Sequence, residues 1–182
     1  MTQKADVKIY SDSGPIYLRH MTLEDTDSII TWRNTPRVRD NFIYRRPFTR
    51  ESHLNWIRTQ IEPGHVVQFM ICEASSGRAV GSVYLRDIDR EKGCAEYGIF
   101  IGEEDALGKG YASEAAGLAV TYAFEELALD SLFLRVFADN TAARRSYERA
   151  GFCLIEGKTE NIETEEGIRE MVFYQIENSM RK

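Results

Sequence analysis

Two glycines, Gly108 and Gly110, lie between a predicted β-strand and a predicted helix. Glycine lets the backbone adopt positive φ angles and come close to a ligand. The first turn of a helix also offers free N–H groups, and the helix dipole favours an anion there. Residues 107–112 therefore predict a turn that holds a diphosphate, although a G-x-G pair alone is also typical of a purely structural turn.

Two common nucleotide-binding motifs do not account for this turn. A Walker P-loop requires Gly-Lys-Ser/Thr at a fixed spacing, and that sequence does not follow Gly110. A dinucleotide-binding fingerprint belongs to a βαβ unit, whereas the strands predicted before Gly108 form an antiparallel meander. The turn therefore indicates a phosphate site of another kind.

A second group of candidate residues lies in the N-terminal half. Trp32, Arg33 and Asn34 end one predicted helix, while His53 and Trp56 share a face of the next. Trp and His can stack on a planar group such as a nucleobase, and arginine can hold a diphosphate. The alternative is structural, with His53 as a surface or packing residue and Trp56 in the core.

Charge along the chain is uneven. The formal net charge is -6, so we expect no general nucleic-acid surface. Arginines nevertheless gather in one segment, at Arg33, Arg37, Arg39, Arg45, Arg46 and Arg50. This cluster favours an anionic small-molecule partner, and a solvated basic face is an equal alternative.

Cysteine usage and hydropathy exclude several other classes. Cys72, Cys94 and Cys153 form no C-x-x-C pair, so neither a zinc site nor a disulfide framework is expected. Cys72 and Cys153 lie in apolar stretches and are predicted to be buried. No stretch approaches the roughly 18 apolar residues of a membrane span, and residues 1–13 do not resemble a signal peptide. We therefore expect a cytoplasmic protein without a membrane partner.

The elements that position these residues follow from periodicity and turn signals. Residues 1–14 are predicted to be a flexible tail, and residues 15–182 a single domain. The predicted strands are residues 16–21, 66–72, 79–85, 95–101, 132–137, 152–155 and 168–176, with an acidic turn over 160–166. The predicted helices begin at Thr22, at Thr49 (apolar face Leu54, Ile57 and Ile61), after Gly110 (Ala112, Ala116, Val120, Ala123 and Leu127) and at Thr141.

This order of elements resembles the GNAT superfamily of N-acetyltransferases over about residues 15 to 176. The acetyl-CoA turn of that superfamily, Q/R-x-x-G-x-G/A, is matched by Gly110 and Ala112, whereas Leu107 departs from it. Its later pattern N-x-x-A-x-x-x-Y, which ends in G-F, is matched by Asn140, Ala143, Tyr147 and Gly151-Phe152. The branch that acetylates ribosomal proteins shares the general layout.

The resemblance implies an α+β fold, with a central mixed, mostly antiparallel twisted sheet of about seven strands flanked by about four helices. It also implies acetyl-CoA as co-substrate and no metal. The backbone of residues 99–101 would bond the pantetheine arm like an added strand. The residues that would contact CoA are Ile99, Phe100, Ile101, Leu107, Gly108, Lys109, Gly110, Tyr111, Ala112, Ser113, Asn140 and Ala143.

Direct transfer within this superfamily implies two proton transfers. Tyr147 would protonate the departing thiolate, since the reference pKa of a phenol, about 10, exceeds that of a thiol, about 8.5. Asn140 can instead simply cap its helix, and Tyr147 can instead be a packing side chain. Glu96 would accept the amine proton, or it would pair with an arginine across the sheet.

The acceptor is the least defined partner. Trp32-Arg33-Asn34, Arg37-Val38-Arg39 and residues 51–57 are similar to acetyltransferases that act on nucleotide-linked amino sugars, of which the pseudaminic-acid-pathway family is the nearest. A peptide N-terminus or a small amine such as spermidine is the second expectation, although the arginine-rich segment argues against spermidine. A CoA-binding module without turnover is the third. Dimers are common in the superfamily, so a homodimer stays open.

Overall fold

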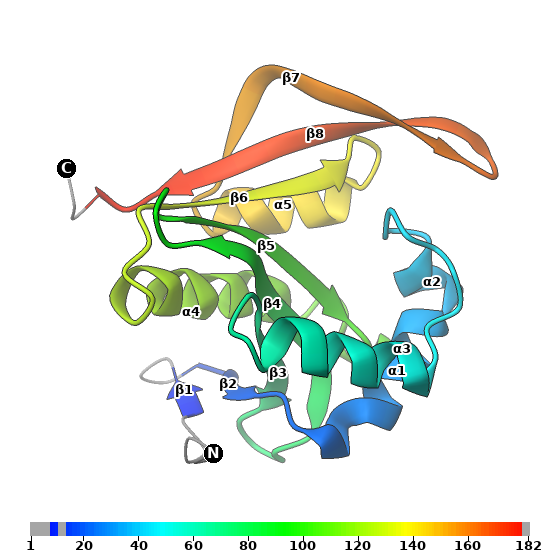
Figure 1. Cartoon of the computed structure of the whole chain (residues 1–182), viewed down its shortest axis with the longest axis vertical. Coiled ribbons are helices and arrows are strands. Elements are labelled where there is room, and N and C mark those ends of the chain that lie inside the picture. Colours follow the sequence, from blue (N-terminus) through cyan, green and yellow to red (C-terminus); the bar gives the residue numbers. More distant parts are fainter. Residues whose placement is uncertain (1–7, 11–13, 180–182) are drawn as a thin grey trace.

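The computed structural model describes residues 8–10 and 14–179. Within them, eight strands form one sheet in the order β1-β2-β3-β4-β5-β6-β8-β7 (Figure 1). The strands are β1 (Lys8–Tyr10), β2 (Ile16–His20), β3 (Val67–Glu73), β4 (Ala79–Asp89), β5 (Cys94–Ile101), β6 (Ser131–Phe137), β7 (Cys153–Thr164) and β8 (Gly167–Glu177). Among the described strands, β5 and β6 alone pair in parallel. The predicted mixed, mostly antiparallel sheet is confirmed.

Five α-helices accompany the sheet in the described part of the chain. They are α1 (Thr26–Asn34), α2 (Pro36–Arg39), α3 (Arg50–Trp56), α4 (Tyr111–Glu125) and α5 (Thr141–Arg149). Shorter turns are η1 (Leu23–Asp25), η2 (Ile57–Ile61) and η3 (Glu104–Ala106). None of the helices among the described residues has the length and apolar character to cross a bilayer.

The sheet separates two hydrophobic cores because side chains alternate along its strands. On β3, Phe69 and Ile71 face the core that α4 and α5 cover, whereas Met70 and Cys72 face the core of α1 and α2. Small residues of α4, including Ala115 and Ala119, are fully buried and let that helix lie close to the sheet. The two layers of helices thus meet opposite faces of the same strands.

Three predictions about the edges of the sheet are wrong. Residues 8–10 of the predicted tail pair with β2 as β1, while residues 1–7 and 11–13 lie outside the described residues. The predicted acidic turn is instead mostly strand, since β7 and β8 pair continuously from Thr159↔Val172 to Thr164↔Gly167. Cys153 is exposed because it opens the edge strand β7. The long β7–β8 hairpin projects from the body as an arm (Figure 1).

The predicted apolar face of α3 is also wrong. Leu54 is 40% exposed, whereas His53 is completely buried. Thr49 caps the helix as expected, by accepting the Ser52 N–H. The helix then widens into the π-helical turn η2, in which the Glu62 N–H bonds the Ile57 carbonyl at 2.9 Å. A π turn contains more residues than an α turn, so the 3.6-residue phase used for the prediction does not continue through it.

Candidate active site

The parallel pair β5–β6 opens into a wedge. Three registered pairs join the two strands, from Cys94↔Ser131 to Glu96↔Phe133. Beyond them β5 continues to Ile101 and β6 to Phe137 without pairing to each other, and Figure 1 shows the two ribbons diverging. A cavity of about 650 Å³ lies there, lined by β5, the start of α4, α5 and residues 37–44. The wedge leaves one edge of β5 available to an extended ligand.

The glycine turn lies at the mouth of this cavity. Gly108 has φ +72 and Gly110 has φ +80, both in the left-handed region where glycine is favoured. A Cβ added at either position would meet no atom within 4 Å, so the space above the turn is open. Gly110 is the N-cap of α4 and supplies no capping side chain. The first N–H groups of α4 are therefore available to an anion.

Tyr147 projects from α5 into the other wall. It is 7% exposed and packs among aromatic rings, with centroid distances of 6.0 Å to Tyr97 and 6.2 Å to Phe152. No side chain or backbone group in residues 8–10 and 14–179 hydrogen-bonds its hydroxyl. Burial raises the pKa of Tyr147, so the phenol stays protonated. The hydroxyl is thus a buried acid whose proton is free to be donated.

Asn140 caps α5, which is the alternative to CoA contact that the sequence left open. Its side-chain oxygen accepts the Ala143 N–H at 3.2 Å, and its amide donates to Asn41 Oδ1 at 3.0 Å. The residue nevertheless lies on the cavity wall, where it joins α5 to residues 37–44. The cap is observed, and contact with CoA stays a prediction.

Glu96 lies on the cavity wall between two arginines. Its Oε2 accepts from Arg86 Nη2 at 2.8 Å, and its Oε1 accepts from Arg135 Nε at 3.1 Å. Both carboxylate oxygens therefore accept hydrogen bonds. This is the cross-sheet arginine pairing that the sequence offered as the alternative to a general base. Arg135 Nη1 also lies 3.7 Å from Glu160 Oε2 of the arm. Accepting a proton would remove the negative charge that holds both arginines.

Residues 16–153 match the family model of the acetyltransferase (GNAT) domain. The chain belongs to the GNAT acetyltransferases. The uncharacterized N-acetyltransferase p20 of Bacillus licheniformis is 31% identical over 128 residues, which are 68% of this chain and 71% of p20. YdaF of Bacillus subtilis (strain 168), whose name assigns it provisionally to the ribosomal N-acetyltransferases, is 38% identical over 82 residues, 45% of this chain and 44% of YdaF.

Solved structures share the fold. Spermidine N-acetyltransferase from Vibrio cholerae, in complex with CoA and spermine, superposes with a TM-score of 0.83. The match covers 91% of this chain and 96% of that one at 22% sequence identity. The likeness shows the fold. The family match and the relative p20 make the chain an N-acetyltransferase, and acetyl-CoA, which that family uses, is its co-substrate.

The cavity fits CoA in shape and chemistry. The open glycine turn suits the pyrophosphate, and the unpaired edge of β5 suits the amide groups of pantetheine. Almost all predicted CoA residues line the wall: Ile99, Phe100, Ile101, Leu107, Gly108, Gly110, Tyr111, Ala112, Ser113, Asn140 and Ala143. Lys109 is the exception, because its Nζ lies 3.7 Å from Glu73 Oε1 and over the Tyr111 ring.

Four residues predicted to contact the acceptor lie behind the wall. Trp32 Nε1 donates to Glu103 at 2.8 Å, and Asn34 bonds both backbone groups of Phe48. His53 is fully buried, and neither ring nitrogen has a partner among the described residues. Burial also lowers the pKa of His53 and keeps it neutral. Trp56 Nε1 donates to Gln68 Oε1. In this structure the four side chains therefore contact other protein groups and do not line the cavity.

Arg33 has a different environment from its neighbours. Its guanidinium lies 3.4 Å from the centroid of Phe42 and 5.0 Å from that of Phe48. No carboxylate of the described chain pairs with it, and its Nε is buried without a hydrogen-bond partner. Burial lowers the pKa of Arg33, while Tyr84 and Arg86 are the titratable groups that act on it. Arg33 itself does not line the cavity; its guanidinium, without an ion pair among the described residues, stacks on the ring of Phe42, which does.

Several wall residues escaped the sequence prediction. They are Tyr84, Arg86, Arg135, Arg145 and Arg149, and residues 41–44. Arg86 faces Glu96 directly across β4 and β5, and Tyr84 faces Gly98, where a Cβ would meet its ring. Strand pairing makes Tyr84 and Arg86 neighbours of β5, so the local sequence carries only a weak signal for these two: polar residues at alternating positions of a predicted strand.

Proposed function

We propose that this acetyltransferase acetylates a primary amine on an acceptor that carries negative charge, and that a nucleotide-linked amino sugar suits the site best. One observation carries the proposal. Among the described residues, the cavity wall contains five arginines and one glutamate: Arg37, Arg86, Arg135, Arg145, Arg149 and Glu96. The one carboxylate, Glu96, is already paired with Arg86 and Arg135, so the described wall offers no free carboxylate to a cationic acceptor.

The charge argues against a polyamine acceptor. Spermine, the ligand named with the Vibrio cholerae structure, is a polycation in neutral water. Two like charges about 6 Å apart repel by roughly 3 kcal/mol at an effective dielectric constant of about 20. A polyamine would meet this repulsion from guanidiniums at the wall without a matching group of carboxylates. A shared fold therefore does not extend to a shared acceptor.

Arg33 supports an anionic acceptor. Its Nε is buried without a hydrogen-bond partner in the described structure, and an acceptor phosphate or carboxylate that reached past Phe42 would compensate this charge. Phe42 and Tyr44, which line the wall near it, offer rings for a nucleobase. These rings replace His53 and Trp56 in the stacking role that the sequence suggested.

The chemistry follows from the positions of the wall groups. The backbone of β5 and the turn at Gly108 and Gly110 hold acetyl-CoA with its thioester toward Tyr147. The acceptor amine forms a bond to the acetyl carbonyl carbon, and the carbon–sulfur bond breaks. Tyr147 donates its proton to the departing thiolate, while the amine gives up its proton to Glu96 or to water.

A panel of acceptors tests the proposal. Thiol release from acetyl-CoA is followed with UDP-linked amino sugars, spermidine and peptides with free N-termini. We expect the highest kcat/KM with the UDP-linked amino sugars, and Arg33→Gln should lower it about tenfold or more. Arg58→Gln, on the exposed surface outside the wall, is the matched control. A higher kcat/KM for spermidine than for the anionic acceptors would overturn the proposal.

The likeness to YdaF favours a second candidate, acetylation of a protein N-terminus. A peptide would rank first in the same panel if this candidate held. CoA binding without thiol release from any acceptor would instead indicate a module without turnover. Both outcomes contradict the anionic-acceptor proposal and leave the CoA site intact.

A further inference from the structure

We propose that Arg145 and Arg149, on the cavity side of α5, bind phosphate groups of CoA and replace the contact that Leu107 cannot make. The inference rests on the use of acetyl-CoA and is independent of which acceptor the enzyme takes. It addresses the one position where the acetyl-CoA turn departs from its family pattern.

The two arginines form a short cationic row. They lie four residues apart on α5, so their side chains are neighbours on one helical face. Both line the cavity and both are exposed. Neither has an ion pair or hydrogen bond to any residue in the described ranges. Arg144, between them and the N-cap, points elsewhere, because it donates to the Tyr174 hydroxyl and to the Ala138 carbonyl.

Packing between α4 and α5 brings this row to the glycine turn. Ser113, in the first turn of α4, lies 3.3 Å from both the carbonyl and the hydroxyl of Ser146. Arg145 therefore stands next to the residue that contacts the phosphate-binding end of α4. A ligand phosphate held by the N–H groups of α4 would lie within reach of a long, flexible guanidinium from α5.

The other cations near the turn are already engaged. Arg86 and Arg135 bind Glu96, and Arg37 donates to the carbonyls of Ile101 and Gly102 at 2.9 and 2.7 Å. Lys109 pairs with Glu73. Arg145 and Arg149 are thus the wall arginines that keep all their donors available within the described structure.

The charge of the ligand requires such donors. CoA carries a pyrophosphate and a 3′-phosphate, while a helix N-terminus contributes only about half a positive charge. The usual Gln or Arg of the turn would add a side-chain donor, but Leu107 adds none. Guanidinium–phosphate contacts are short, strong and often bidentate, so the α5 row supplies what the turn lacks.

Isothermal titration of the purified enzyme tests the proposal with CoA and with 3′-dephospho-CoA. The variants are Arg145→Gln, Arg149→Gln and the double variant, and Arg58→Gln is the control because it is exposed and lies outside the wall. We expect the double variant to bind CoA at least tenfold more weakly than wild type. Arg58→Gln should bind like wild type, and all melting temperatures should agree within about 2 °C.

The two ligands separate the phosphate groups. A loss confined to CoA assigns the row to the 3′-phosphate, and an equal loss for both ligands assigns it to the pyrophosphate; either result supports the proposal. An unchanged Kd for CoA in the double variant would overturn it. Arg145→Lys with Arg149→Lys should restore part of the affinity, which a defect in folding would not allow. Because no acceptor is present, failure here leaves the acceptor proposal untouched.

Discussion

Tyr147 combines a buried ring with a hydroxyl that lacks a partner in the described structure, and this combination suits an acid. Burial raises its pKa, so the phenol remains a donor at all pH values below its already high reference value of about 10. We predict that Tyr147→Phe lowers kcat by about 10²- to 10⁴-fold while the Kd of acetyl-CoA changes little. Single-turnover thiol release and calorimetry measure the two quantities.

Tyr97 provides the matched control for this substitution. Its hydroxyl is also buried without a partner, and its ring lies 6.0 Å from that of Tyr147. Tyr97→Phe should therefore keep kcat near the wild-type value and should not lower stability, since no hydrogen bond is lost. If Tyr97→Phe abolished turnover and Tyr147→Phe did not, the acid would be Tyr97.

Glu96 is predicted to act mainly as the ionic link between Arg86 and Arg135. Glu96→Gln leaves two guanidiniums without their carboxylate, so we expect the free energy of unfolding to fall by about 1–3 kcal/mol. Urea denaturation measures this change. Turnover should persist in the variant. Loss of turnover with unchanged stability would return Glu96 to the role of general base.

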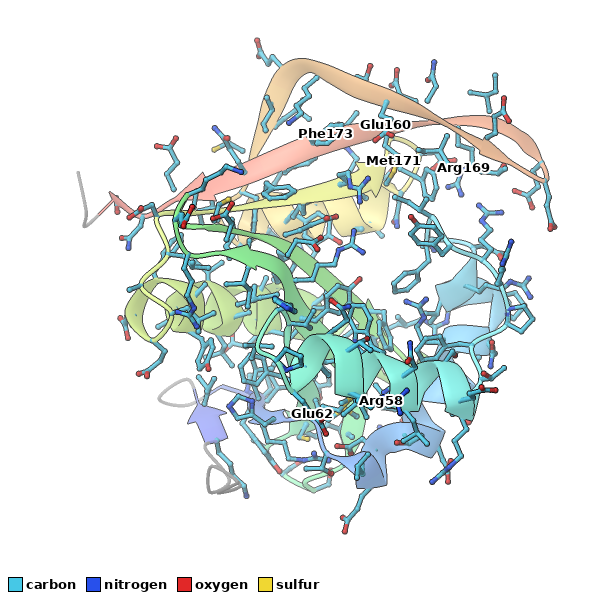
Figure 2. The ribbon with its side chains drawn as sticks, in the orientation of Figure 1. Arg58, Glu62, Glu160, Arg169, Met171 and Phe173 are labelled. Carbon is cyan, nitrogen blue, oxygen red and sulfur yellow. The ribbon has the colours of Figure 1, made fainter. Side chains whose placement is uncertain are left out.

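The β7–β8 arm reaches the acceptor side of the site through Arg169, which Figure 2 shows on β8 near Met171. Arg169 donates to Asp139 and to the Asp40 carbonyl, and it lies 3.7 Å from the centroid of Phe137. Its contact with Asp40 holds the start of the wall segment 41–44.

We therefore predict that Arg169→Gln raises the KM of the acceptor several-fold, because residues 41–44 lose an anchor. The KM of acetyl-CoA should stay within about twofold, since neither Arg169 nor Asp40 is among the described residues that line the cavity beside the glycine turn. Steady-state kinetics with each substrate varied in turn provides the check. Glu163→Gln, exposed near the tip of the arm, is the control. Equal increases in both KM values would contradict this prediction, because they would indicate that the substitution disturbs the whole fold and not residues 41–44.

Sequence periodicity predicted the main helices and strands. Local motifs predicted the glycine turn and the Tyr147 helix of the site. Residues close in sequence form both the strand–turn–helix unit around Gly110 and the capped helix that contains Tyr147. Both can therefore be predicted from local sequence patterns. The apolar face of α3 was predicted from Leu54, Ile57 and Ile61, but a π turn over Ile57–Ile61 breaks that periodicity, and His53 is buried in place of Leu54. The Arg86–Glu96–Arg135 cluster was only partly foreseen because cross-strand register assembles it. The length of the β7–β8 arm was not predicted, because its exposed strands are rich in charged residues and lack the apolar alternation by which strands are recognised.

At the scale of the whole molecule, charge is segregated. The chain carries a formal net charge of -6, yet arginines outnumber acids on the described cavity wall. Acidic residues concentrate on the arm, at Glu160, Glu163, Glu165, Glu166 and Glu170. A positive cavity within a negative surface guides an anion over short distances, because the distant like charges are screened more than the near opposite ones.

This segregation predicts how salt acts on the reaction. With acetyl-CoA saturating, kcat/KM for an anionic acceptor should fall as NaCl rises from about 0.02 to 0.5 M, over which the Debye length shrinks from about 20 Å to about 4 Å. A neutral amine of similar size should show little change, and a polyamine should gain from screening of its repulsion. The comparison is made at constant pH with the same thiol-release assay. A salt-independent kcat/KM for the anionic acceptor would mean that the arginines of the wall act on CoA alone, and the acceptor would then have to be recognised by shape.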